Sequence, residues 1–199
     1  MAVSEELEVL KDVVGRLERA GIAYMITGST AANFYAVPRM TRDIDIVIEL
    51  EERDVGRFIP LFENDYYLEP NTVRGAVKHR TMFNLIQNEY VIKVDFVVRK
   101  DSEYRKMEFT RRRKITVDDE SIYVVAPEDL ILSKLLWAKD SGSEVQLLDV
   151  RNLLNAVKRL NRSYLTHWVK RLGVGALYRK VAKCMTLRRP SKTGLGRCS

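Results

Sequence analysis

The sequence has few of the residues and patterns that mark several common protein classes. It contains no run of 18 apolar residues, which excludes a membrane-spanning helix. Its two cysteines, Cys184 and Cys198, are consistent with a reducing compartment, and its two histidines argue against a histidine-rich metal site. The N-terminus is acidic and amphipathic, unlike a signal peptide. We therefore expect a cytoplasmic protein with no membrane partner.

Acidic residues are missing from the last part of the chain. No Asp or Glu follows Asp149, whereas residues 151–199 contain 13 lysines and arginines. The first 150 residues carry 21 basic and 27 acidic side chains, so the net charge of +7 comes from the C-terminal part. Such asymmetry indicates a basic surface that could bind RNA, DNA or another polyanion. A solvated helical face with a cationic tail explains it equally well.

The most informative stretch runs from Met25 to Leu50, MITGSTAANFYAVPRMTRDIDIVIEL. It predicts a strand ending at Gly28, a short helix, and a second strand that begins with Asp43-Ile44-Asp45. Strand residues two apart point to the same face, so the two aspartates present their carboxylates side by side. Such carboxylates repel each other unless a cation lies between them. Mg²⁺, or alternatively Mn²⁺, suits a pair of oxygen ligands.

A candidate phosphate site adjoins these carboxylates. Ser29 follows Gly28 at the end of the first strand, and we expect it to cap a helix from Thr30 to Tyr35. The N-terminal amides of a helix attract phosphate. Alone, an Asp-x-Asp is usually a solvated strand end and a Gly-Ser is usually a turn. Together they favour phosphoryl or nucleotidyl transfer.

The succession of Gly-Ser, a helix and Asp-x-Asp resembles the nucleotidyltransferase superfamily to which DNA polymerase beta belongs. The fuller pattern, which adds Arg39 and Arg42, looks closest to the small bacterial and archaeal branch that includes AbiEii-type toxins. The resemblance covers residues 22–155 and implies metal-dependent transfer of a nucleotide from an NTP. It implies that Gly28 and Ser29 bind the β- and γ-phosphates. The two arginines would add positive charge to that site, unless they are merely solvated.

Asp95 stands alone among apolar residues in a strand predicted over 90–98. A buried aspartate is costly unless it is paired or bound to a metal ion. The resemblance implies that Asp95 is the third catalytic and metal-binding carboxylate, with Asp43 and Asp45. The alternative is a salt bridge with Lys93, which lies two residues away on the same face.

The later segment PEDLILSKLLWAKDSGSEVQLLDVRNLL also resembles the AbiEii-type branch. The resemblance implies that Lys134 helps to bind the nucleotide phosphates and that Asp149 supports the site. The more usual form has an arginine in the second half of the segment, where Lys139, Glu144 and Gln146 stand in this sequence. The alternatives are that Lys134 extends over a helix interface towards solvent and that Asp149 pairs with Arg151 or Lys158 at the surface.

The hydrophobic periodicity and the resemblance together predict an α+β fold. We expect a nucleotidyltransferase-type mixed β-sheet flanked by helices, followed by a C-terminal helical bundle. The expected regions are a catalytic core over 1–125, helices over 126–185 and a disordered basic tail over 186–199. Within the core, we expect a helix over 52–63, an irregular or weakly stranded segment over 65–80 and a hairpin formed by 81–87 and 90–98.

Three functions compete. The first is a nucleotidyltransferase with an RNA, tRNA or protein acceptor, acting as the toxin of a toxin–antitoxin system with an antitoxin protein as partner. The second is a nucleotidyltransferase that modifies a small molecule such as an antibiotic. The third is a non-catalytic relative that only binds a nucleotide or a protein. The presence of all three carboxylates argues against the third, but fold analogy alone does not fix a substrate.

Overall fold

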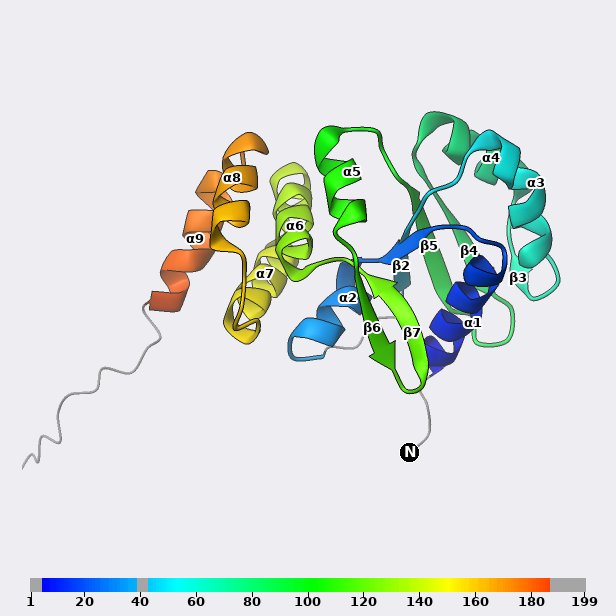
Figure 1. Cartoon of the computed structure of the whole chain (residues 1–199), viewed down its shortest axis with the longest axis horizontal. Coiled ribbons are helices and arrows are strands. Elements are labelled where there is room, and N and C mark those ends of the chain that lie inside the picture. Colours follow the sequence, from blue (N-terminus) through cyan, green and yellow to red (C-terminus); the bar gives the residue numbers. More distant parts are fainter. Residues whose placement is uncertain (1–4, 39–42, 187–199) are drawn as a thin grey trace, which may run out of the picture. The chain divides into compact units, whose positions relative to one another are not determined.

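The computed structural model describes residues 5–38 and 43–186 of the 199-residue chain. The chain divides into two compact units, Met1–Leu130 and Ile131–Ser199. The elements of the first unit run from blue to green in Figure 1, and those of the second run from yellow-green to orange. Among the described residues, no helix is both long enough and apolar enough to cross a membrane.

The described part of the first unit is built on a seven-stranded sheet in the order β3-β4-β5-β2-β1-β7-β6. The strands are β1 (Tyr24–Ile26), β2 (Asp43–Ile48), β3 (Tyr66–Tyr67), β4 (Met82–Gln87), β5 (Lys93–Val98), β6 (Arg113–Val117) and β7 (Glu120–Val124). Strand β2 pairs with β5 in parallel and with β1 in antiparallel orientation, so the sheet is mixed. The predicted α+β fold with a mixed sheet and flanking helices is confirmed.

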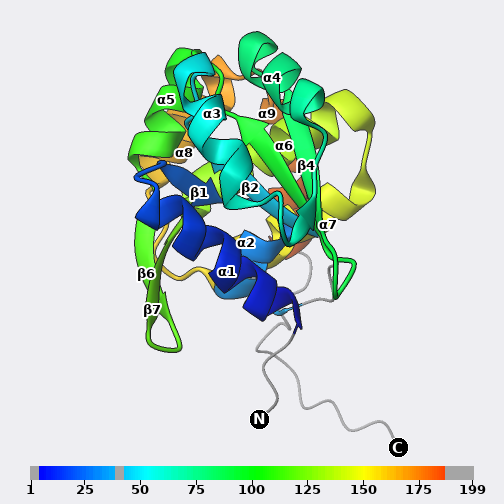
Figure 2. The same ribbon diagram turned by 90° about the vertical axis from the view of Figure 1, so that its right-hand side faces the viewer.

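Helices and short turns connect these strands. They are α1 (Glu5–Arg19), α2 (Gly28–Tyr35), η1 (Glu52–Asp54), α3 (Val55–Phe58), η2 (Ile59–Leu61), α4 (Pro70–His79) and α5 (Glu103–Thr110). Figure 2 shows α1 and α3 in front of the sheet. Helix α3 packs on it through Phe58, whose ring centroid lies 5.5 Å from those of both Phe83 and Phe96.

The three neighbouring strands β4, β5 and β2 have one apolar and one polar face. On the apolar face, Ile44, Ile46, Leu85, Val94 and Phe96 are each no more than 1% exposed. The residues between them alternate to the other face, where the side chains of β2 and β4 are exposed or half-buried and Asp95 of β5 is buried. This period-2 alternation is what places polar residues of these strands on one side of the sheet.

Two expectations for the first unit were right only in part. The segment expected to be irregular over 65–80 contains α4, because Glu69 caps the helix by accepting bonds from the amides of Asn71 and Thr72. Pro70 at the first helical position needs no hydrogen-bond partner for its nitrogen. The helix expected over 52–63 is formed as three successive short helices, η1, α3 and η2, over residues 52–61, with Pro60 inside η2.

The second unit is helical, as expected. Its elements are the main part of α6 (Pro127–Ser141), α7 (Glu144–Ala156), α8 (Arg162–Arg171) and α9 (Gly175–Thr186). Val150, Leu153 and Leu165 are fully buried within this unit. Helix α7 ends at Ala156 because Val157 adopts an extended conformation. An ion pair between Lys180 and Glu144, 2.9 Å long, joins α9 to the start of α7.

Candidate active site

The sheet register brings the three predicted carboxylates to one face. Asp45 and Asp95 are partners on the parallel strands β2 and β5, and Asp43 is the partner of Lys93. Partners in register share a face of the sheet, and so do residues two apart along one strand. Asp43 is exposed, Asp45 is half-buried and Asp95 is only 6% exposed. The structure therefore brings together Asp43, Asp45 and Asp95, and it adds Lys93 to them.

Lys93 forms an ion pair with the most buried of these carboxylates. Its Nζ lies 2.8 Å from Oδ2 of Asp95 and 3.9 Å from Oδ1 of Asp43. A hydrogen bond to Asp95 raises the pKa of Lys93, and the nearby charges of Asp95, Asp43 and Asp45 raise it further against a smaller effect of burial. The salt bridge considered as the alternative role of Asp95 is thus present in the structure.

The other oxygen of Asp95 is unsatisfied. Its Oδ1 is buried and has no hydrogen-bond partner. A buried carboxylate oxygen without a partner is costly, and a hard cation with oxygen ligands would satisfy it. Within residues 5–38 and 43–186, no group of three or more His, Cys, Asp or Glu side chains is arranged to hold a metal ion as it stands. Metal binding by Asp43, Asp45 and Asp95 therefore stays a prediction. Their carboxylate oxygens are the kind of ligand that Mg²⁺ or Mn²⁺ binds.

Gly28 sets how closely helix α2 approaches the carboxylates. Its φ of +62° lies in the left-handed region, and a Cβ atom at this position would lie 1.9 Å from Oδ2 of Asp45. The amide of Thr27 donates to the carbonyl of Asp45 (2.9 Å), and the hydroxyl of Thr30 donates to the carbonyl of Asp43 (3.3 Å). A residue with a side chain would push the first turn of α2 away from β2.

The expected capping role of Ser29 was wrong. Helix α2 begins at Gly28 and Thr27 is its N-cap, so Ser29 lies inside the first turn rather than before it. The helix starts two residues earlier than expected because Gly28, in the left-handed conformation, can take its first position. The amides of the first turn still face no intrahelical acceptor, as at any helix N-terminus. Arg39 and Arg42 lie outside the described residues.

Lys134 and Asp149 are brought together in the second unit. Nζ of Lys134 lies 2.7 Å from Oδ2 of Asp149 and 3.0 Å from Oε1 of Gln146. Both members of the ion pair are buried, with side chains 4% exposed. The alternatives of a solvent-directed Lys134 and a surface Asp149 are therefore wrong, because each charge is buried against the other. Their nucleotide-binding roles stay predictions.

Asn84 is a polar residue of this face that the sequence pattern did not single out. It is the register partner of Asp95 on β4, so a row of three polar residues, Asn84, Asp95 and Asp45, crosses three strands. Asn84 is exposed and lies between the buried residues Phe83 and Leu85. The alternation of residues 82–87 could have placed Asn84 on the polar face, but its pairing with Asp95 depends on the register.

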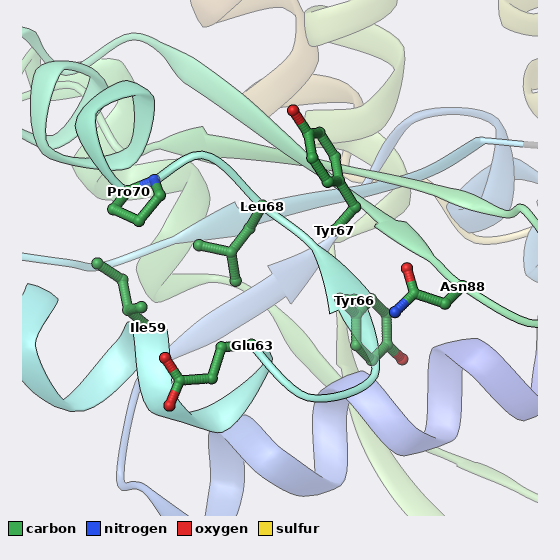
Figure 3. A pocket seen from close by; sticks show the side chains of 7 residues that line it. All are labelled: Ile59, Glu63, Tyr66, Tyr67, Leu68, Pro70 and Asn88. Atoms are coloured by element: carbon green, nitrogen blue, oxygen red, sulfur yellow. The ribbon is translucent and has the colours of Figure 1, made fainter.

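Two surface hollows lie elsewhere in the first unit. One of about 280 Å³ lies at the edge strand β3, where Ile59 and Glu63 lie opposite Leu68 and Pro70 (Figure 3). A larger one, of about 490 Å³, lies between α1 and the β6–β7 hairpin and includes Lys11. Of the predicted site residues that the structure describes, none lines either hollow.

Comparison with known proteins defines the fold. The sequence matches no protein-family model and no curated protein. Solved structures do match. The structure of ANT(2″)-Ia in complex with adenylyl-2″-tobramycin has a TM-score of 0.57 and 12% identity, over 89% of this chain and 99% of that one. The lincomycin-bound lincosamide antibiotic adenylyltransferase LnuA has a TM-score of 0.53 and 16% identity, over 79% of this chain and all of that one.

A third match has a TM-score of 0.51 and 17% identity over 90% of this chain and 93% of that one. It is an antigenic nucleotidyltransferase-like protein from Paracoccidioides brasiliensis. The chain has the nucleotidyltransferase fold. At these identities the likeness extends to the fold alone. In the nucleotidyltransferase fold of this chain, the carboxylates lie at the start of β2 and in β5, and Gly28 opens the helix beside them.

Proposed function

We propose that the protein is a metal-dependent nucleotidyltransferase that moves a nucleotide from an NTP to an acceptor hydroxyl. The observation that carries this proposal is the register of Asp45 and Asp95 on one face of the sheet, with Gly28 in contact with Asp45. Carboxylates for a divalent cation and helix amides for a polyphosphate are the two elements that nucleotidyl transfer requires.

Each group would have a distinct task in this reaction. Asp43, Asp45 and Asp95 would hold Mg²⁺ or Mn²⁺, which when bound lowers the pKa of the acceptor hydroxyl and offsets the negative charge of the triphosphate. Gly28 and Ser29 would bind the β- and γ-phosphates through the amides of the first turn of α2.

The proposed reaction is an in-line displacement at the α-phosphorus, in which one bond forms as another breaks. The acceptor oxygen bonds to the α-phosphorus, the bond from that phosphorus to the β-phosphate oxygen breaks, and pyrophosphate leaves. Asp95 would accept the proton of the hydroxyl. With the leaving group at α2, the acceptor would approach from the opposite side, across β5 and β4. There Asn84 and Met82 offer an exposed amide and a half-exposed apolar side chain on the same face as Asp95.

The acceptor that we propose is RNA, such as tRNA, or a protein, in a toxin of a toxin–antitoxin system. The excess of Lys and Arg after Asp149 supports a polyanionic acceptor. The toxin role, and an antitoxin as partner, rest on the resemblance of the Gly28–Asp45 motif to AbiEii-type proteins. The proposed roles of Lys134 in binding the nucleotide and of Asp149 in supporting the site rest on the same resemblance.

A small-molecule acceptor is the second candidate. It is supported by the similarity to ANT(2″)-Ia, which is bound to adenylyl-2″-tobramycin, and to LnuA, which is bound to lincomycin. The acidic balance of the first 150 residues would also suit a cationic acceptor.

The test is incubation of the protein with Mg²⁺ and each α-³²P-labelled NTP, with tRNA, total RNA, lysate protein, tobramycin or lincomycin as acceptor. Label that appears in one acceptor and disappears with Asp43→Ala/Asp45→Ala would support transfer and identify the acceptor class. The matched control is Glu52→Ala/Glu63→Ala, which removes the same charge from two exposed positions. Failure of the wild type to label any acceptor or to bind any NTP would contradict the proposal.

A further inference from the structure

Lys93 lies among the carboxylates that are predicted to bind the metal ion. It lies at the first position of β5, in register with Asp43 and two residues before Asp95. Its side chain therefore points to the polar face of the sheet, between two of the predicted metal-binding residues. The ion pairs of 2.8 Å to Asp95 and 3.9 Å to Asp43 are the result.

Three carboxylates on adjacent strands need a positive charge to stay together. In this structure the ammonium group of Lys93 supplies that charge, and it does so from the same strand as Asp95. The interaction leaves the cluster incomplete, however, because Oδ1 of Asp95 is buried without a hydrogen-bond partner. A single ammonium group satisfies one oxygen of Asp95, whereas a divalent cation could also engage the remaining oxygen.

The Lys93 side chain can move away from Asp95 into solvent. It is 39% exposed, whereas that of Asp95 is only 9% exposed, so the lysine lies on the solvent side of the pair. A lysine has a flexible four-carbon stem, and its ammonium group is readily hydrated. Rotation of that stem would carry the charge into solvent and would leave the aspartates in place on their strands.

We propose that Lys93 is a built-in counter-cation that competes with a divalent metal ion for Asp95, so that metal binding displaces its ammonium group from the carboxylate cluster. The inference rests on the proposed function, in which these carboxylates hold the metal. Lys93 is then a positioning residue: it keeps the carboxylates assembled before the metal ion binds, and it weakens metal affinity while doing so.

The experiment is a titration of the full chain with Mn²⁺ alone, with free Mn²⁺ measured by electron paramagnetic resonance. Lys93→Met removes the charge and keeps most of the stem, and Lys93→Gln is a second neutral variant. Lys93→Arg keeps the charge. Lys78→Met is the matched control, because it removes one positive charge from an exposed position on α4.

We expect both neutral variants to bind Mn²⁺ about tenfold more tightly than the wild type, because a unit charge close to the site no longer opposes the ion. Lys93→Arg and Lys78→Met should bind like the wild type. Added Mg²⁺ should also raise the unfolding temperature of Lys93→Met by more than that of the wild type, since tighter binding stabilises the folded state more.

Equal Mn²⁺ affinity in the wild type and both neutral variants would overturn the inference, as would the absence of Mn²⁺ binding in every variant. The transfer assay separates this failure from that of the proposed function. Nucleotide transfer by the wild type with unchanged Mn²⁺ affinity in the variants refutes only the role of Lys93. Tighter Mn²⁺ binding without nucleotide transfer supports the competition and refutes the proposed function.

Discussion

The molecule contains two lysine–aspartate pairs of almost equal length and very different surroundings. Lys134 and Asp149 are 2.7 Å apart, both are 4% exposed, and Gln146 also accepts a hydrogen bond from the lysine. Lys93 and Asp95 are 2.8 Å apart, but the lysine is 39% exposed and one oxygen of the aspartate has no partner. The first pair is enclosed and the second is open.

The two pairs differ in whether water or another cation can replace one partner of the ion pair. An enclosed ion pair has lost its hydration, so removal of either member leaves a buried charge. In the open pair the lysine can return to water, and the aspartate has spare capacity for another cation. The two pairs would look equivalent if only the distance between the charged atoms were compared.

The largest expected effect comes from breaking the enclosed pair. Lys134→Met should lower the free energy of unfolding by about 3–5 kcal/mol, because the buried carboxylate of Asp149 loses its ammonium partner. Lys93→Met should cost less than that, because Lys93 is 39% exposed and its pair with Asp95 is open to water on one side. Urea unfolding of both variants measures the contrast. Lys134→Met/Asp149→Leu should recover most of the loss, and equal losses in the two single variants would refute the distinction between the pairs.

A substitution in the open pair, Lys93 and Asp95, should instead affect the rate of nucleotide transfer. Asp95→Asn should lower the rate of nucleotide transfer about a thousandfold, because the amide cannot accept the proton and is a poorer metal ligand than a carboxylate. Its stability should stay close to that of the wild type. Initial rates with labelled NTP test this, with Asp140→Asn as the control at an exposed position. A rate within tenfold of the wild type would exclude Asp95 as the base.

Substitution of two glycines by alanine tests how much the close approach of α2 to Asp45 matters for stability. Gly28→Ala should destabilise the protein by about 2–3 kcal/mol, since the new Cβ would meet Asp45 and the φ of +62° disfavours it. Gly21→Ala has a similar φ of +64° and no atom within 4 Å of the new Cβ, so it should cost only about 1 kcal/mol. Equal losses would show that contact with Asp45 adds nothing.

The buried tyrosine Tyr66 should make the stability of the protein depend on pH. The hydroxyl of Tyr66 donates to Oδ2 of Asp12 (2.7 Å), and burial followed by this hydrogen bond raises the pKa of Tyr66. Above pH 10 the unfolded chain releases the proton that the folded protein retains, so stability falls as the pH rises. The Tyr66 contribution is at most about 1.4 kcal/mol per pH unit. Tyr66→Phe should reduce the slope of unfolding free energy against pH between 10 and 11.5. An unchanged slope would contradict this assignment.

The smallest effect concerns the turn that leads into β5 and Lys93. Val91 has a φ of +55°, a conformation that is unfavourable for a β-branched residue, and its side chain is 75% exposed. Val91→Asn should stabilise the protein by about 1 kcal/mol without altering Mn²⁺ binding. Val37→Asn, at another exposed valine, is the control and should be neutral. A destabilised Val91→Asn would show that the valine packs in a way that offsets its strain.

Much of the fold could be predicted from local patterns. The helix from Glu5 and the strands β4 and β5 follow from hydrophobic periodicity, because each pattern records which face of one element is buried. The helix α4 was missed because its start depends on Glu69 as a cap, and glutamate is not among the residues that usually mark a helix start. The capping role given to Ser29 was wrong for the same kind of reason, since the conformation of Gly28 moved the helix start.

The sequence by itself determined which residues carry charge and on which face of each strand they lie, because strand alternation is a local property. It was sufficient to place Asp43 and Asp45 side by side and to single out Asp95 and Lys93. Only the tertiary structure decided which strands are neighbours and in which register. That is why the row of Asn84, Asp95 and Asp45 could not be foreseen.

Tertiary structure also decided what surrounds each charge. Lys134 and Asp149 are fifteen residues apart and form an enclosed pair only because two helices pack together. Arg111, which the sequence presents as one of a basic run, binds the buried Glu128 and Asp129. Burial and hydration are properties of the packed molecule, and they determine whether an ion pair stabilises the fold or remains available to a ligand.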